Sequence, residues 1–188
     1  TREDIEKNMN ADATFDFDQV ISISTEEVLK AQFLDENLPV IGAVALPDVG
    51  INLPIFKGVA YNALFYGAGT TSPEQVMGEG NYGLASHRAA DMSLLFSPLE
   101  KSQEGQLIYI TDLANIYSYE IYAKRRVQPT EISVLDVIED KKIVTLITCG
   151  DGAGTNRLVI QGELKEVTPV KDASQKMANA FNLTKNTY

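Results

Sequence analysis

The sequence predicts a mainly β fold, a closed or nearly closed β-barrel with a few short helices. Short apolar or alternating segments recur along the chain, turn residues such as those at 47–50 separate them, and helical periodicity is scarce. Many short strands with few helices are typical of barrels. The length of 188 residues and the 44% hydrophobic content fit one soluble domain with a sizeable core.

The N-terminal region differs from the rest of the chain in charge. Residues 1–40 carry ten acidic and three basic side chains, so they supply most of the formal net charge of −10. Phe15 and Phe17 are candidate contacts within this acidic run. The Ser-Thr-Glu-Glu sequence at 24–27 resembles a capping box and predicts a helix that runs to about residue 33. We therefore expect an acidic extension with a helix over residues 1–37.

Strand candidates follow one another from residue 38. They lie at residues 39–46, 51–57, 81–87, 106–111, 116–127, 142–149 and 157–167, in that order. The segment 142–149 is apolar on both faces, which is typical of a central strand. These segments define the expected barrel domain, residues 38–170.

Alternation in the last strand candidate predicts which side chains share a face. Leu158, Ile160 and Leu164 point one way, and Arg157, Val159, Gln161 and Glu163 point the other. The candidate at 116–127 alternates in the same manner, with Tyr117, Tyr119, Ile121 and Ala123 opposite Ser118, Glu120, Tyr122 and Lys124. Arg157 is therefore expected to point away from the core.

The expected helical segments of the barrel domain are short. The Ser-Pro-Glu-Gln sequence at 72–75 predicts a brief helix that ends at Gly78, with proline in its first turn. An apolar cluster predicts a helical turn within residues 91–99. In the C-terminal tail, residues 171–188, apolar residues at helical spacing predict a segment that either packs on the barrel or stays loose. Those residues are Met177, Ala180 and Phe181.

Composition argues against several classes of function. The chain has no basic face or stripe beyond the short run at 124–126, so nucleic-acid binding is not expected. One cysteine cannot form an internal disulfide, which leaves the redox compartment undetermined. No apolar run approaches the ~18 residues of a membrane span, and no signal peptide is present. Because the chain starts at Thr1 rather than Met, we expect a fragment or a processed product.

The single cysteine and the single histidine both lie at predicted strand ends. Cys149 precedes a flexible glycine-rich loop, His87 lies where a strand meets a loop, and Arg157 begins the next strand. If the two strands that flank this loop are neighbours, Cys149 and Arg157 lie close across its mouth. A thiolate attacks a carbonyl, an imidazole moves protons, and a guanidinium stabilises developing negative charge. These three groups are sufficient for covalent acyl transfer.

The residues alone leave this interpretation open. A cysteine in an apolar strand is more often an inert core residue, and a solitary histidine is usually structural. Most arginines at strand rims only form solvated pairs. The strand that ends at Cys149 is apolar on both faces, so its pattern does not settle which way the thiol points.

Phosphate and metal sites are not indicated. The glycines of residues 150–154 resemble a phosphate-binding loop, but such loops open a helix, and here a strand is expected to follow. Two clusters of acidic residues are candidate calcium sites, but neither cluster has the spacing of a calcium-binding loop. These are Asp136, Glu139 and Asp140, and Glu100 with Glu104. We therefore expect no metal and no other cofactor.

Several motifs resemble those of a known family. Residues 145–149, Thr-Leu-Ile-Thr-Cys, resemble the Thr-Leu-x-Thr-Cys signature of sortases, and Arg157 lies where their essential arginine follows it. Residues 81–87 resemble the strand that delivers the sortase histidine, with Ser86 where many members have glycine. Residues 127–136 are similar to the loop that walls the sortase substrate groove, and the Ile-Asn-Leu-Pro-Ile sequence at 51–55 is also typical. The resemblance covers about residues 38–168 and points to class A, the housekeeping type, in its streptococcal and lactobacillal form.

The resemblance implies an eight-stranded sortase barrel, tethered by an N-terminal transmembrane helix to the outer face of a Gram-positive cell membrane. It implies cleavage of Leu-Pro-x-Thr-Gly sorting signals between Thr and Gly, through a thioacyl-enzyme that an amine of lipid II releases. By position, Cys149 is the nucleophile, His87 the general acid and base, and Arg157 the group that binds substrate or oxyanion. The positions that line the pocket for the Leu-Pro part are Ala85, Val127, Pro129 and Ile132. The calcium ligands of some class A members are not matched here.

Two other functions stay open. One is a cysteine peptidase or hydrolase on the same barrel, which would transfer the acyl group to water. The other is a non-enzymatic β-barrel surface interaction module in which Cys149 and His87 are accidental.

Overall fold

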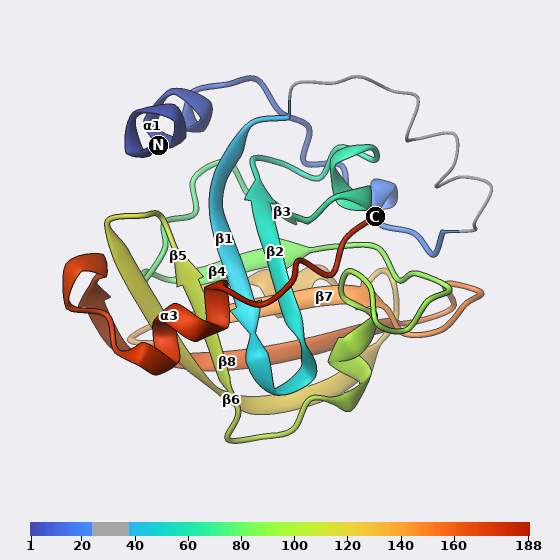
Figure 1. Ribbon diagram of the computed structural model, residues 1–188. Helices are drawn as coiled ribbons and strands as arrows, with labels where there is room; N and C mark the ends of the chain where they lie inside the picture. Colours follow the sequence, from blue (N-terminus) through green and yellow to red (C-terminus); the bar gives the residue numbers. More distant parts are fainter. Residues whose placement is uncertain (24–37) are drawn as a thin grey trace.

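The computed structural model describes residues 1–23 and 38–188, and its centre is a closed β-barrel (Figure 1). The strands are β1 (Val40–Leu46), β2 (Ile51–Phe56), β3 (Ala68–Thr70), β4 (Asn81–Ala85), β5 (Leu107–Thr111), β6 (Asn115–Val127), β7 (Ile143–Cys149) and β8 (Arg157–Pro169). Around the barrel they follow the order β1-β2-β3-β4-β7-β8-β6-β5. The pairs β2–β3 and β4–β7 are parallel, and the other pairs are antiparallel. The predicted fold class, a closed mainly β barrel, is confirmed.

The strand predictions are confirmed to within a few residues, except that β3 is missing from them. β3 has three residues, too few for any periodicity. Its Gly69 lies so close to the backbone of Gly58 that a Cβ atom would collide with the Gly58 carbonyl. A glycine is therefore required where β-branched residues usually mark a strand.

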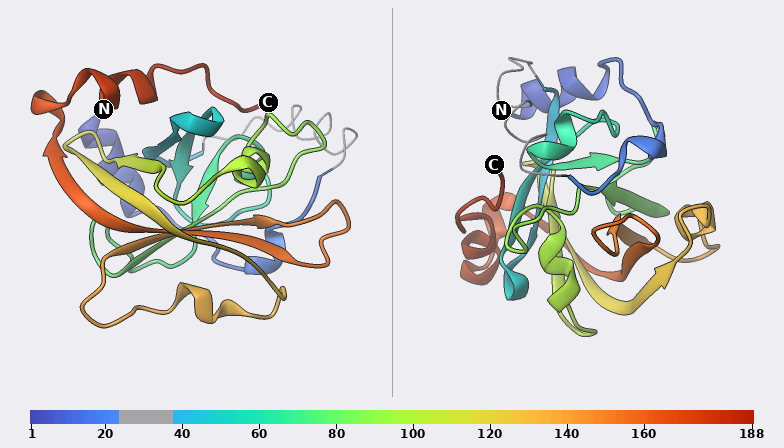
Figure 2. Two further views of the ribbon diagram at one scale, coloured as in Figure 1. Left: turned by 90° about the horizontal axis from the view of Figure 1, so that it is seen from below. Right: turned by 90° about the vertical axis from the view of Figure 1, so that its right-hand side faces the viewer.

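β7 is packed on both faces, as the sequence predicts for a central strand, and the first half of β8 is packed on both faces as well, although its sequence alternates. Leu146, Leu158 and Ile160 belong to the main core inside the barrel. Ile147 and Val159 belong to a second apolar cluster on the outside. In the left view of Figure 2, the gold β6–β7 connection runs along the outside of the barrel. It supplies residues that cover this second cluster.

One helical prediction in the barrel domain is wrong, and another is confirmed in part. Residues 72–78 form turns because the Gln75 side chain accepts a hydrogen bond from the Ser72 amide at 3.1 Å and donates to the Gly83 carbonyl at 2.8 Å. These bonds compete with a helical backbone. The helical turn expected within residues 91–99 is found in part, because the amides of Leu94 and Ser97 close turns there and a 3-10 helix runs over Ser97–Lys101, after Leu95 with φ of 52°.

The N-terminal extension contains a helix that was not predicted. Helix α1 (Arg2–Met9) begins with a capping box in which the Thr1 and Asp4 side chains bond to each other's backbone. Its Ile5 is buried in the main core. The helix predicted from residue 24 to about residue 33 lies outside the described residues. Among the described residues, no helix is both long and apolar enough to cross a bilayer.

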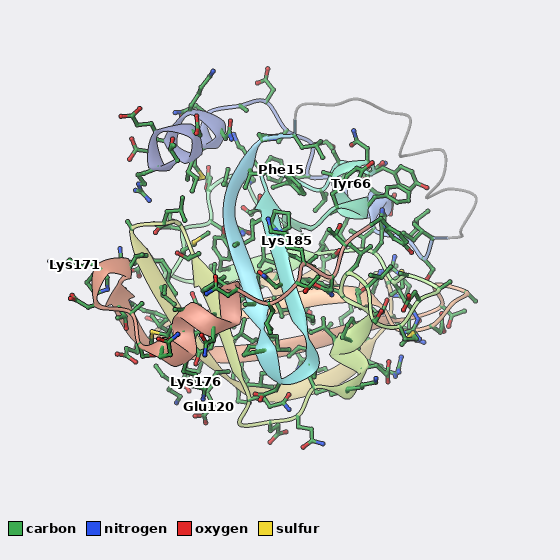
Figure 3. All side chains as sticks on the ribbon, viewed as in Figure 1. Phe15, Tyr66, Glu120, Lys171, Lys176 and Lys185 are labelled. Atoms are coloured by element: carbon green, nitrogen blue, oxygen red, sulfur yellow. The ribbon has the colours of Figure 1, made fainter. Side chains whose placement is uncertain are left out.

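The C-terminal tail packs on the barrel, one of the two expected outcomes. In helix α3 (Gln175–Phe181), Met177 and Ala180 are buried in a cluster with residues of β1, β5 and β6. Lys171 and Lys176, in this part of the chain, have exposed side chains on the outside of the molecule (Figure 3). The last residues cross the outside of the barrel (Figure 1), where the Asn186 side chain accepts a hydrogen bond from the Asn52 amide at 2.9 Å.

Candidate active site

Strand pairing brings Cys149 and Arg157 together. β7 and β8 are antiparallel neighbours, and Cys149 lies directly opposite Arg157 in their register. Residues that lie directly opposite each other point to the same face of a sheet. Arg157 Nη1 accordingly lies 3.5 Å from Cys149 Sγ. The condition stated from the sequence, that these strands are neighbours, is confirmed, and the thiol points to the outer face of the barrel with Arg157.

The parallel pair β4–β7 positions His87 at the same end of the barrel. Ala85 lies opposite Ile147, so His87 and Cys149 each follow two residues after this pair. Ser86 extends the contact beyond the strand, because its amide donates to the Ile147 carbonyl at 3.2 Å. The Thr148 hydroxyl in turn donates to the Ser86 carbonyl at 2.8 Å. Ser86 and Thr148, the residues directly before His87 and Cys149, are therefore joined to the neighbouring strand by hydrogen bonds.

The His87 ring is buried between two aromatic side chains. Tyr61 and Phe65 contact it edge-on, with ring centroids 5.3 and 5.1 Å from the imidazole. Nε2 lies 3.1 Å from the Tyr61 carbonyl oxygen, and Nδ1 lies 2.8 Å from that of Ile21. A ring that carries protons on both nitrogens can donate to both carbonyls. These contacts fix the plane of the imidazole ring.

The end of the first described segment, at Val20 and Ile21, lies against the side chains of Cys149, His87 and Arg157. The Val20 carbonyl oxygen lies 3.1 Å from Arg157 Nη2 and 3.8 Å from Cys149 Sγ. Ile21, the next residue, contacts His87 as described above. Cys149, His87 and Val20 are each 0% exposed. A short stretch of the N-terminal segment, residues 16–22, therefore takes part in shielding the thiol.

An apolar pocket continues from this point along the outer face of the barrel. Phe17 of the N-terminal segment lies in it, together with three of the four positions that the resemblance assigns to substrate binding. Those three are Val127, Pro129 and Ile132. The fourth, Ala85, is buried in a cluster with Val20, Val59 and Leu64, and Phe17 packs against that cluster as well. The structure brings all four positions next to one stretch of the N-terminal segment, which contains a 3-10 turn at Phe17–Gln19.

A buried polar network holds the outer wall of this pocket. The Asn81 side-chain amide donates to the Val134 carbonyl at 3.0 Å and to the Asp136 carbonyl at 2.9 Å. Thr145 donates its hydroxyl to the Asn81 side-chain oxygen at 2.6 Å, and Gln161 donates to the Val134 carbonyl at 3.1 Å. Buried polar groups with satisfied partners fix one backbone conformation. The wall segment is therefore tied to the barrel at its middle.

The β7–β8 loop, residues 150–156, has its own internal bonds. The Asp151 carboxylate accepts hydrogen bonds from the Thr155 side chain and from its amide at 2.9 Å, and these lower the pKa of Asp151. The Ser22 hydroxyl donates to the Asp151 carbonyl at 2.8 Å. At the right of Figure 1 the N-terminal segment, the loop after β4 and the β7–β8 loop come together.

Several residues of this site were not identified from the sequence. Phe17 was flagged only as a candidate contact, while Val20, Ile21, Tyr61 and Phe65 were not identified at all. Phe17 and Val20 stand in an acidic stretch with no strand or helix period, and an apolar residue in such a stretch is the one available signal. The five residues meet the barrel through contacts between distant parts of the chain, which local patterns do not report.

Acidic side chains do not gather into a metal site within residues 1–23 and 38–188. No group of three or more His, Cys, Asp or Glu side chains there is arranged to hold an ion. Asp136, Glu139 and Asp140 are exposed at the end of the wall segment, and Glu100 pairs with arginines.

Comparisons with known proteins agree with this geometry. The sequence profile of the Sortase domain family matches residues 44–165, which include His87, Cys149 and Arg157. Sortase A of Streptococcus agalactiae serotype III is 42% identical over 187 residues, which cover 97% of this chain and 76% of that protein. Sortase A of Listeria monocytogenes serovar 1/2a is 43% identical over 164 residues, which cover 87% and 73% respectively. A crystal structure of Listeria monocytogenes sortase A has a TM-score of 0.71 at 39% identity and covers 77% of this chain and 99% of its own.

Proposed function

Because this chain belongs to the sortase family and is a sortase transpeptidase of the class A type, we propose that it cleaves Leu-Pro-x-Thr-Gly sorting signals between Thr and Gly. Its first substrates are surface proteins that carry this signal near the C-terminus. Its second substrate is an amine of lipid II, the cell-wall precursor. The enzyme works at the outer face of the Gram-positive cell membrane, held by an N-terminal transmembrane helix in the full-length protein.

One observation carries this proposal: the N-terminal segment already lies against the thiol, the arginine and the apolar pocket. The carbonyl of Val20 lies against Cys149 and Arg157, and Phe17, three residues earlier, lies in the apolar pocket. In the sorting signal, Leu likewise precedes Thr by three residues. Valine and threonine are both β-branched and close in size. The N-terminal segment therefore matches the signal in this three-residue offset, with Val20 in place of Thr and Phe17 in place of Leu, although its residues Phe17–Gln19 form a 3-10 turn.

In the first step, acylation, the Thr carbonyl of the sorting signal takes the place of the Val20 carbonyl. The Cys149 thiolate adds to the Thr carbonyl of the signal, and negative charge develops on its oxygen. Arg157 donates hydrogen bonds to that oxygen, because its Nη2 already lies 3.1 Å from the Val20 carbonyl oxygen. His87 gives a proton to the departing glycine nitrogen, the C–N bond breaks, and a thioester to Cys149 remains.

Deacylation uses the same groups in reverse order. The amine of lipid II adds to the thioester carbonyl, and His87 accepts the proton that the amine loses. The C–S bond then breaks, a new amide forms, and Cys149 leaves as the thiolate. Transfer to an amine exceeds hydrolysis when the thioester is shielded from water. The aromatic side chains of Tyr61 and Phe65 around His87 contribute to such shielding.

Substrate binding requires the N-terminal segment to leave the groove. Val20 and the thiol are fully buried against each other, so the segment and a sorting signal compete for one site. The pocket residues Val127, Pro129 and Ile132 then contact the Leu-Pro part of the signal. Ala85, which the resemblance also assigns to that part, packs in a cluster with Val20 and so is expected near the Thr instead. We further propose that the reaction needs no metal ion or other cofactor.

Mass spectrometry of the enzyme with a Leu-Pro-x-Thr-Gly peptide tests this function. We expect a thioacyl adduct on Cys149 that ends at Thr and that added triglycine removes as a new amide. Cys149→Ala should keep its melting temperature and form neither adduct nor product. The same assay in EDTA should give an unchanged rate.

Other results distinguish the alternatives. Hydrolysis without any amide product, even at high triglycine, would favour a peptidase on the same barrel. A Cys149→Ala variant with normal turnover would exclude the thiol as nucleophile. A wild-type chain that forms no adduct with any sorting peptide would favour a non-enzymatic module.

A further inference from the structure

One arginine links the two ends of the β7–β8 loop. Arg126, near the end of β6, donates through Nη1 to the Gly150 carbonyl and to the Asn156 side-chain oxygen, the latter at 3.1 Å. Gly150 directly follows Cys149, and Asn156 directly precedes Arg157. The Gly150 amide also donates to the Asn156 carbonyl at 2.9 Å, which closes the loop at its base. The guanidinium therefore contacts both the residue that follows Cys149 and the residue that precedes Arg157.

A carboxylate holds this arginine and reaches the third chemistry-bearing residue. Arg126 Nη2 lies 2.7 and 2.9 Å from the two carboxylate oxygens of Glu100, in the 3-10 helix Ser97–Lys101. Glu100 also pairs with Arg88 at 3.6 Å, and Arg88 directly follows His87. One carboxylate with two guanidinium groups thus connects the sequence neighbours of His87, Cys149 and Arg157.

The loop is built to accept this contact. A Cβ atom at Gly150 would collide with the side chains of Asn156 and Arg126. Position 150 must therefore stay without a side chain for the guanidinium to reach the backbone. None of these groups lines the pocket that holds Phe17.

We propose that Arg126 and Glu100 are positioning residues for the transpeptidation reaction. They fix the backbone around Cys149 and Arg157, and so set the approach of the thiolate to the scissile carbonyl. Small errors in that approach reduce the rate of the chemical step without weakening substrate binding. The inference rests on the proposed roles of Cys149, His87 and Arg157.

The test measures kcat and KM with a sorting peptide and triglycine, with kcat expressed per Cys149 titrated by an irreversible thiol reagent. Arg126→Gln should lower kcat about tenfold and change KM less than about twofold. Glu100→Gln leaves the loop contacts of Arg126 in place and should lower kcat about threefold. The double variant should be no slower than Arg126→Gln alone, because both changes remove one unit. If Arg126→Gln does not fold, Glu100→Gln and Gly150→Ala carry the test.

Lys142→Gln is the matched control. It removes an exposed ion pair of 3.0 Å with Glu79, at the other end of β7, and should change neither constant. Overturning results are values of kcat per titrated thiol within about twofold of the parent, or losses found only in KM or in melting temperature. Failure of the proposed function shows itself in the parent enzyme, which then makes no product. Failure of this inference shows itself in an active parent whose variants match it.

Discussion

At the scale of single residues, Arg157 serves two groups at once. Its Nη1 lies 3.5 Å from the Cys149 sulfur, and its Nη2 lies 3.1 Å from the carbonyl oxygen of Val20. A planar guanidinium can direct two N–H groups to separate acceptors, whereas an ammonium is a single point charge on a flexible stem. Charge alone therefore does not account for this position.

Arg157→Lys tests that geometric requirement. We expect kcat/KM for a sorting peptide to fall about a hundredfold, because lysine cannot hold both the sulfur and the developing oxyanion. Arg125→Lys, on β6, is the control. Arg125 bonds to the Gln161 side chain at 3.2 Å, and its variant should stay within about twofold of the parent. A near-normal rate for Arg157→Lys would assign Arg157 to stability alone.

The sequence identifies the chemistry-bearing residues better than their surroundings. Cys149 and His87 are unique in composition, so their types and strand-end positions could be found from the sequence. The direction of the thiol could not, because β7 is apolar on both faces. The structure gives the physical reason: the outer face, with Ile147, is covered by the wall segment and by Phe17. Packing from outside the strand removes the alternation that would have set its facing.

At the scale of elements, the N-terminal segment acts as a competitor of the substrate. Phe17 lines the apolar pocket, and Val20 lies against the thiol. A ligand that must displace such a segment binds with an apparent affinity reduced by the fraction of open molecules. We therefore expect the acidic extension to raise the concentration of substrate that the enzyme needs.

Phe17→Ala should open the groove. Loss of about 1–2 kcal/mol of apolar burial weakens the closed state, so KM for the sorting peptide should fall by about fivefold or more. Alkylation of Cys149 by iodoacetamide should become faster by a similar factor. Phe15→Ala is the matched control, because Phe15 lies in the same segment but not in the pocket, and both quantities should stay unchanged. Unchanged KM and alkylation in Phe17→Ala would contradict competition by this segment.

Among the elements, the periodicity of apolar residues predicts the long strands. It fails where side-chain hydrogen bonds or the close approach of glycines determine the backbone conformation. β6 and β8 have 13 residues each, and their bounds are predicted closely, although irregularities in their pairing interrupt the alternation of β6. The helix expected at residues 72–78 is absent because one glutamine side chain bonds to the backbone instead. Such bonds depend on β4, which the chain reaches only later. The sequence therefore predicts the barrel but not the connections that shape its groove.

At the scale of the whole molecule, the extension is attached to the barrel at both of its described ends. Near its start, Asn8 donates to the Val40 carbonyl at 2.8 Å, and Arg2 forms an ion pair of 3.0 Å with Asp112 in the β5–β6 turn. Near residue 20 it is held by the candidate active site. Substrate entry can therefore free the second attachment while the first keeps the segment nearby, so the groove closes again after release.

Asp112 makes the first attachment sensitive to acid. Burial raises the pKa of this carboxyl, but hydrogen bonds from the Asn115 and Ala114 amides and the Arg2 guanidinium outweigh it, so the pKa lies below its ordinary 3.8. A lowered pKa in the folded state means that the stabilisation is present above the ordinary value and is lost as the pH falls through the folded one. The attachment is thus at full strength at neutral pH.

Asp112→Asn should therefore lower stability in a pH-dependent way. At pH 7 we expect a loss of about 1 kcal/mol in the free energy of unfolding, a modest figure because Arg2 is nearly half exposed. The difference from the parent should shrink as the pH falls below the ordinary carboxyl pKa, since the parent then loses the same charge. Urea unfolding at pH 7 and at a pH below the ordinary carboxyl pKa measures the free energies of unfolding. Asp48→Asn, in the exposed β1–β2 turn, is the control. A loss of equal size at both pH values would show that Asp112 stabilises the molecule by packing and not by its charge.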